Sequence, residues 1–160
     1  MAVVLRPFAP GDEDAVIAVI LPIQREEFGV AITAADQPDL ADIPGWYQVG
    51  AGQFWLAELD GRVVGTIALK DIGGGAVALR KMFVRAEARG PGGVAQALLD
   101  GALAHARAHG VSAIWLGTTD AFKAAHRFYE RNGFSLVEIA DLPPAFPRMA
   151  VDTRFYRLGL

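Results

Sequence analysis

One stretch of the chain, residues 82–99, constrains the fold more than any other. Its first residues, Met82 to Val84, are apolar strand formers, and its last residues follow the alanine and leucine spacing of a helix. Between them lies a loop of glycines and arginines. Glycine lets a ligand approach the backbone closely, and the free N–H groups at the start of a helix attract anions. The sequence therefore predicts a strand–loop–helix unit that can bind phosphate.

The loop does not match the two best-known phosphate-binding motifs. It lacks the G-x-G-x-x-G order of dinucleotide-binding folds and the Gly-Lys-Ser/Thr ending of the NTPase loop. The glycines alone leave a tight turn without a ligand as an alternative interpretation. A nucleotide-phosphate enzyme that uses this loop is disfavoured, because neither a Walker lysine nor a second carboxylate accompanies it.

Two motifs together resemble the GCN5-related N-acetyltransferases (GNAT). Gly93-Val94-Ala95 resembles the second half of the family motif Arg/Gln-x-x-Gly-x-Gly/Ala, whereas Gly90 stands where the family has arginine or glutamine. Residues 125–134 resemble the second motif, Ala-x-x-Phe/Leu-Tyr-x-x-x-Gly-Phe. The resemblance implies one domain over residues 1–160 with the acyl-CoA N-acyltransferase fold. This is an α/β (α+β) architecture with a mixed, mostly antiparallel sheet of about six to seven strands, a splayed fourth and fifth strand, and about four flanking helices.

The resemblance also implies the site residues and the cosubstrate, acetyl-CoA. Tyr129 stands at the family's tyrosine position, where a phenol with a pKa of about 10 protonates the departing thiolate. The backbone N–H of Val84 would hold the oxyanion. A core tyrosine packed with Phe128 is the alternative. The residues expected to bind the cofactor are Met82, Phe83, Val84, Arg89, Gly90, Gly92, Gly93, Val94, Ala95, Ala125 and Phe128.

The general base stays open. Relatives use a glutamate on the fourth strand, where this chain has Ala78, so Glu26, Glu27 or a water chain would have to take the proton. Phe122 stands where relatives often carry an asparagine that contacts the pantetheine. The missing glutamate favours a non-catalytic acyl-CoA-sensing or partner-binding domain on the same fold. The retained tyrosine favours an N-acetyltransferase (EC 2.3.1.-) in which the amine attacks the thioester directly.

Charge is distributed unevenly along the chain. Residues 12–42 contain eight acids and one arginine, whereas the whole chain has a net charge of −3 and basic residues gather around the glycine loop. This pattern predicts a small-molecule amine acceptor at the acidic segment and coenzyme A at the basic cluster, unless both are solvated faces. An aminated small molecule ranks above an amino acid, which Arg80, Arg148 and Arg154 would suit, and above a protein amine. The expected acceptor-binding residues are Glu26, Glu27, Trp46, Tyr47 and Arg80.

Composition argues against several other classes. The chain has no cysteine, which excludes disulfides and thiolate metal sites, and a pI near 5.6 argues against a nucleic-acid binder. His105 and His109 lie one helical turn apart without a third ligand, so we expect no metal. Without a signal peptide or an apolar run of membrane length, we expect a cytoplasmic protein, either a monomer or a homodimer.

Hydrophobic spacing predicts the order of the elements. Leu79 and Met82 are both apolar and three residues apart, which predicts a bulge near Arg80 and Lys81. The strand–helix–strand order from residue 76 to residue 117 predicts a parallel pair. Residues 29–52 should form a loop or a broken helix over the acceptor. Strands are expected at 3–5, 54–59, 63–69, 76–84, 111–117, 134–139 and 149–158, and helices at 12–28 with a kink at Pro22, at 94–109 and from 119 or 120 to 132.

Overall fold

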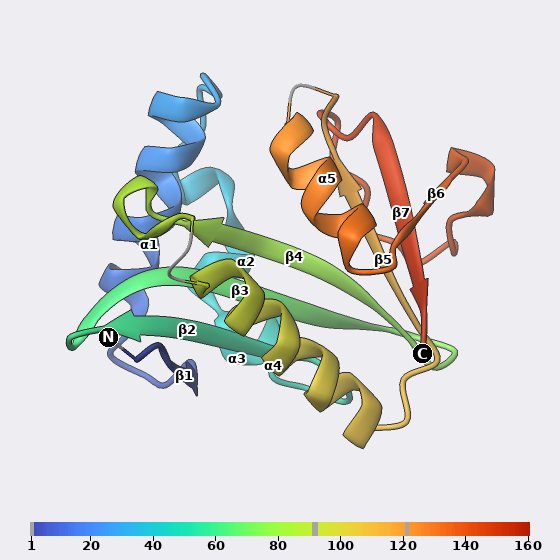
Figure 1. The fold of residues 1–160 in the computed structure, drawn as a ribbon, viewed down its shortest axis with the longest axis horizontal. Coiled ribbons are helices and arrows are strands. Elements are labelled where there is room, and N and C mark those ends of the chain that lie inside the picture. Colours follow the sequence, from blue (N-terminus) through green and yellow to red (C-terminus); the bar gives the residue numbers. More distant parts are fainter. Residues whose placement is uncertain (1, 91–92, 121) are drawn as a thin grey trace.

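The computed structural model describes residues 2–90, 93–120 and 122–160. Seven strands form one sheet in the order β1-β2-β3-β4-β5-β7-β6, in which β4 and β5 are parallel and the other neighbours are antiparallel (Figure 1). The predicted mixed, mostly antiparallel sheet is therefore confirmed. The strands are β1 (Val4–Pro7), β2 (Gln53–Leu59), β3 (Arg62–Gly73), β4 (Ala76–Val84), β5 (Ala113–Thr118), β6 (Ser135–Val137) and β7 (Arg154–Gly159).

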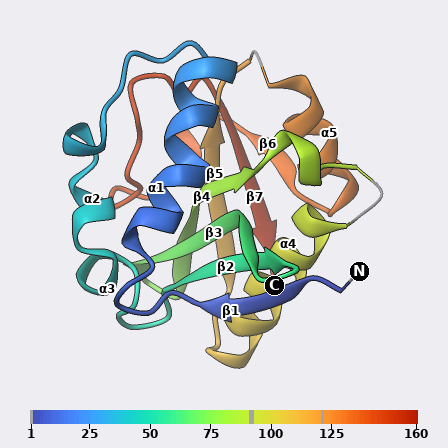
Figure 2. The same ribbon diagram turned by 90° about the vertical axis from the view of Figure 1, so that its left-hand side faces the viewer.

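Helices cover both faces of the sheet. The first three lie on one face, and α4 and α5 lie on the other (Figure 2). After Pro22 the first helix continues as a π-helical turn over residues 23–27, because proline lacks the N–H that would extend the α-helical pattern. No helix in the described part of the chain is long and apolar enough to cross a membrane. The helices are α1 (Glu13–Pro22), α2 (Pro38–Ala41), α3 (Ile43–Trp46), α4 (Val94–Ala108) and α5 (Lys123–Arg131).

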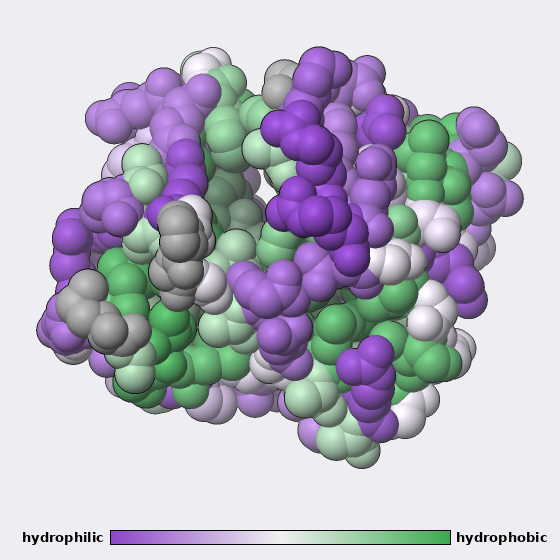
Figure 3. All heavy atoms as spheres, viewed as in Figure 1, coloured by the Kyte–Doolittle hydropathy of each residue, from purple (hydrophilic) through white to green (hydrophobic). Residues whose placement is uncertain are grey.

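The fourth strand contains the predicted bulge, and it diverges from the fifth. Lys81 and Met82 together lie opposite Ile67, and Lys81 adopts a positive φ of 54°. The hydroxyl of Thr66 donates to the Lys81 carbonyl at 2.6 Å and holds this conformation. Strands β4 and β5 pair only from Ala76 to Ala78 and then separate. The surface is hollowed between the two halves of the sheet (Figure 3).

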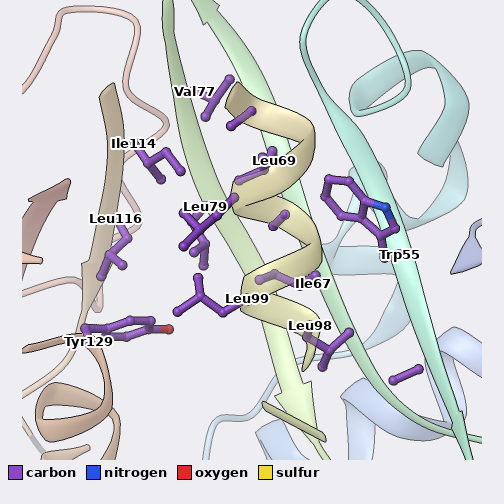
Figure 4. Packing of buried hydrophobic residues seen from close by; sticks show 14 of the residues in the cluster. Trp55, Ile67, Leu69, Val77, Leu79, Leu98, Leu99, Ile114, Leu116 and Tyr129 are labelled. Atoms are coloured by element: carbon purple, nitrogen blue, oxygen red, sulfur yellow. The ribbon is translucent and has the colours of Figure 1, made fainter. Parts of the chain in front are cut away.

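Alternating side chains of the central strands supply two apolar cores. Ile67 and Leu69 face α4, while Ala68 between them packs under α1 to α3, as the period of two in a strand requires. In the core under α4, Leu98 and Leu99 of the helix meet side chains from β3, β4 and β5 (Figure 4). Pairing from Ala76 to Ala78 joins β4 and β5 at one end, and the other end is open.

Several predicted boundaries differ from the structure. The last strand begins at Arg154 instead of residue 149, because Met149 and Asp152 close a turn before it. The strand predicted at 134–139 ends at Val137, where a 3-10 turn follows that is closed by Glu138 and Asp141. Residues 29–52 form a broken helical segment that contains α2 and α3, as expected.

Candidate active site

A cleft of about 630 Å³ opens where β4 and β5 separate. Its walls come from the π-helical turn after α1, from β4 and β5, from the start of α5, and from the connection before β7. The structure brings ten of the sequence-predicted site residues into this lining. They are Arg80, Met82, Phe83, Val84, Arg89, Gly90, Ala95, Ala125, Phe128 and Tyr129.

The glycine loop forms one end of the cleft. Gly93 precedes α4 with a φ of +73°, a conformation that favours glycine, and a Cβ built there would meet no atom within 4 Å. Arg89 donates from Nε to the Val84 carbonyl at 2.8 Å and forms an ion pair with Glu27 at 2.6 Å. Gly93 and the buried Val94 are not part of the lining, and Gly92 lies outside the described residues.

Tyr129 lies on the inner side of α5. Its ring packs against Phe134 and Tyr156 at centroid distances of 5.6 and 6.2 Å, and its phenol oxygen is directed away from α5 (Figure 4). The hydroxyl contacts the thioether sulfur of Met82 at 3.8 Å. Burial raises the pKa of Tyr129, so the phenol stays protonated. A neutral proton donor therefore faces the cleft beside a sulfur atom of β4.

A buried polar network lies beneath the other end of the cleft. The bulge places Lys81 so that its Nζ donates to Gln37 at 2.7 Å and lies 3.4 Å from a carboxylate oxygen of Asp39. The Tyr47 hydroxyl donates to Asp39 at 2.5 Å and accepts from Arg80 at 3.1 Å. Burial lowers the pKa of Lys81, whereas the nearby carboxylate opposes that shift. Two cationic residues of the cleft lining, Arg80 and Lys81, thus share one carboxylate partner, Asp39, which is not part of the lining.

The structure places the other predicted acceptor residues away from the lining. Tyr47 is completely buried, and the Trp46 ring already carries the ammonium of Lys70 at 4.9 Å from its centroid. Glu26 and Glu27 are exposed outside the cleft. The sequence argument from the acidic segment loses its support, because no acid of residues 12–42 lines the cleft.

Sequence reasoning missed two features of the lining. Phe28 and Phe122 pack against each other with ring centroids 3.8 Å apart and planes tilted by 32°, and they connect the α1 side of the cleft to the α5 side. Asp152, in the turn before β7, supplies the only carboxylate among the described residues of the lining. A possible sequence signal for Asp152 was Gly117, a glycine within a buried strand, since such a glycine often marks a close approach. No group of three or more metal-binding side chains occurs in the described ranges.

The known proteins that resemble this chain in sequence are acetyltransferases. The family model described as "Acetyltransferase (GNAT) family" matches residues 17–134. The N-acetylaspartate synthetases of Danio rerio and Homo sapiens are 37% and 41% identical over 124 and 119 residues, or 75% and 73% of this chain. The chain spans only 44% and 39% of the length of these two relatives.

Solved structures of acetyltransferases have the same fold as this chain. A GNAT-family acetyltransferase from Staphylococcus aureus superposes with a TM-score of 0.94 at 37% identity, and 99% of each chain is covered. The N-acetylglutamate synthase of Neisseria gonorrhoeae, solved with coenzyme A and N-acetyl-glutamate, gives a TM-score of 0.76 at 20% identity. That alignment covers 100% of this chain and 35% of the other, and it shows a shared fold.

Proposed function

Since the chain belongs to the acetyltransferase (GNAT) family, we propose that it transfers the acetyl group of acetyl-CoA to the amine of a small molecule. One observation carries this proposal. A single cleft joins the glycine loop at the start of α4 to the buried phenol of Tyr129. The loop can bind the pyrophosphate, and the phenol lies where the thioester sulfur would leave.

The separation of β4 from β5 supports the position of the pantetheine arm. A strand has hydrogen-bonding groups along both edges, and β4 uses one edge for β3. Beyond Ala78 its other edge faces the cleft, since β5 has diverged. Met82, Phe83 and Val84 lie along this free edge. We assign them to the cofactor arm and assign the N–H of Val84 to the carbonyl oxygen that becomes negative during the reaction.

The reaction is a direct transfer. The neutral amine attacks the thioester carbon, a C–N bond forms, and the C–S bond breaks. Tyr129 donates its proton to the departing thiolate and regains one from solvent. Burial raises the pKa of the phenol, but the same apolar surroundings also raise the proton affinity of the thiolate that forms there. The acid and its target are thus matched by their shared environment.

The acceptor we propose is an amino acid, with an acidic amino acid ranked first. Arg80, Lys81 and Arg148 outnumber the carboxylates of Asp39 and Asp152 around this end of the cleft, so it favours a carboxylate. The names of the relatives, N-acetylaspartate synthetase and N-acetylglutamate synthase, indicate the same class of product. This order reverses the ranking expected from the sequence, which placed an aminated small molecule first. Of the three arginines weighed there, Arg80 lines the cleft.

The test is thiol release from acetyl-CoA with a panel of acceptors. We expect aspartate or glutamate to give the highest kcat/KM, followed by neutral amino acids and then by polyamines. Turnover with polyamines alone would refute the proposed acceptor class. Binding of acetyl-CoA without thiol release from any acceptor would refute the enzyme and favour the acyl-CoA sensor, which the absence of a glutamate at Ala78 supports.

A further inference from the structure

We propose that Asp152 is the general base of this site, the carboxylate that removes a proton from the ammonium group of the acceptor. The inference rests on the proposed N-acetyltransferase function. It supplies a role that no residue on β4 fills, since Ala78 occupies the position expected for a glutamate.

The structure holds the Asp152 carboxylate rigidly at the cleft. Its Oδ2 accepts from the backbone N–H of Met149 at 3.0 Å, and its own N–H donates to the Met149 carbonyl at 3.0 Å. Asp152 is only 9% exposed and belongs to the lining. A side chain at Gly117 would collide with it, because a Cβ there would lie 2.7 Å from Oδ2. The glycine in β5 thus leaves space for this carboxylate.

The charges around Asp152 suit a proton acceptor. Burial raises the pKa of its carboxyl group, and the hydrogen bond from the Met149 N–H together with the positive charges of Arg80 and Arg148 opposes that shift. The other titratable residues of the described lining are Lys81, Arg89, Lys123, Tyr129 and Arg131. A desolvated carboxylate is a stronger base than an exposed one and attracts an ammonium group. The same group can therefore bind the acceptor nitrogen and deprotonate it.

Other candidate bases fit less well. Glu26 and Glu27 lie outside the lining, and Glu27 is paired with Arg89. Lys81 is buried, but its Nζ donates to Gln37 and lies 3.4 Å from Asp39, an arrangement that uses the ammonium form. Tyr129 is protonated and serves as the acid. Asp152 remains as the proton acceptor within the described lining.

The proton balance of the step is complete. The ammonium gives one proton to the Asp152 carboxylate, and the resulting amine forms the C–N bond as the C–S bond breaks. The thiolate takes the phenol proton of Tyr129, and the amide nitrogen releases its second proton to solvent. Asp152 then loses its proton to solvent and Tyr129 regains one. The net products are the N-acetylated acceptor, coenzyme A and one proton.

The experiment compares Asp152→Asn with the wild-type chain over a range of pH. Asparagine can still accept from Met149, so the turn should fold. We expect coenzyme A affinity within about twofold of wild type, and kcat/KM for the acceptor about 100-fold lower near neutral pH. The deficit should shrink as the pH rises toward the pKa of the acceptor amine, because free amine then needs no base. Asp152→Glu should restore part of the activity.

A matched control is Asp141→Asn. Asp141 also closes a turn by accepting a backbone N–H, from Glu138 at 3.0 Å, but it lies outside the cleft lining. Its activity should equal that of wild type. Three results would overturn the proposal: activity of Asp152→Asn near wild type, a loss that is equal at every pH, or a raised acceptor KM with unchanged kcat. A wild-type chain that releases no thiol with any amine would refute the proposed function itself.

Discussion

Replacing Tyr129 with phenylalanine removes one oxygen atom and leaves the packing in place. The ring keeps its neighbours Phe128, Phe134 and Tyr156, at centroid distances of 5.7, 5.6 and 6.2 Å. Within the described residues, the hydroxyl forms one hydrogen bond, a weak one to the Met82 sulfur at 3.8 Å. The change therefore tests the proton donor without disturbing the core.

The expected effects on rate and on stability differ widely. A general acid contributes about 10² to 10⁴ in rate, which corresponds to about 2.7–5.5 kcal/mol in the activation free energy. A weak hydrogen bond to sulfur contributes little, so the free energy of unfolding should change by less than about 1 kcal/mol. Tyr129→Ala would instead leave a cavity and lower the free energy of unfolding by about 3–5 kcal/mol.

The assay combines three measurements on Tyr129→Phe. Single-turnover thiol release measures the chemical step, calorimetry with coenzyme A measures cofactor affinity, and denaturant titration measures stability. The matched control is Tyr156→Phe. Tyr156 is fully buried in the same aromatic cluster, but its hydroxyl donates to Glu130 at 2.6 Å outside the cleft lining. We expect the control to lose stability and keep the chemical rate.

One result would refute the reasoning about Tyr129. If the single-turnover rate of Tyr129→Phe stays within about twofold of wild type, the phenol gives no proton to the thiolate. Tyr129 would then be a core residue, the alternative that its sequence position left open.

Three further predictions follow from the cleft. Gly93→Val should abolish detectable coenzyme A binding in calorimetry, because a β-branched side chain is strained at a φ of +73° and the loop must change its conformation, although a Cβ there would meet no atom within 4 Å; unchanged affinity would move the phosphate site elsewhere. Phe122→Ala removes the ring contact with Phe28, so stopped-flow measurements should show faster coenzyme A association and dissociation, and unchanged rates would contradict a role in access. Arg80→Gln should raise the KM for a carboxylate acceptor at least tenfold and leave the KM for acetyl-CoA unchanged; an equal effect on a neutral amine would argue against charge recognition.

Local patterns made much of the fold predictable. The bulge followed from the spacing of Leu79 and Met82 on one strand, and the parallel pair followed from one strand–helix–strand order. The strands expected at 54–59 and 63–69 likewise form the antiparallel pair β2 and β3. These features depend on residues close together in the chain. The two sequence motifs, each short, then located the glycine loop and Tyr129 without any knowledge of tertiary contacts.

Features that depend on distant contacts were not predictable in this way. Asp152, in the turn before β7, approaches Gly117 of β5, and β5 and β7 are neighbours only in the folded sheet. Charge counted along residues 12–42 does not show which acids can meet a ligand, because some of them are paired: Asp12 binds Arg6 at 2.7 Å and Asp39 lies 3.4 Å from the Lys81 ammonium. A sequence shows how many charges a segment has, but the fold decides which of them face a ligand.

The short pairing between β4 and β5 has a mechanical consequence. The strands pair only from Ala76 to Ala78, so within the described residues no further ladder of backbone hydrogen bonds joins the two strands that line the cleft. We expect amides near the open end to exchange with solvent sooner than those of the ladder. Bound coenzyme A would contact both β4 and β5 and hold the two strands together. At 100 times its dissociation constant, a ligand stabilises the folded state by about 2.7 kcal/mol, so the resistance of this chain to proteolysis should follow the supply of its cosubstrate.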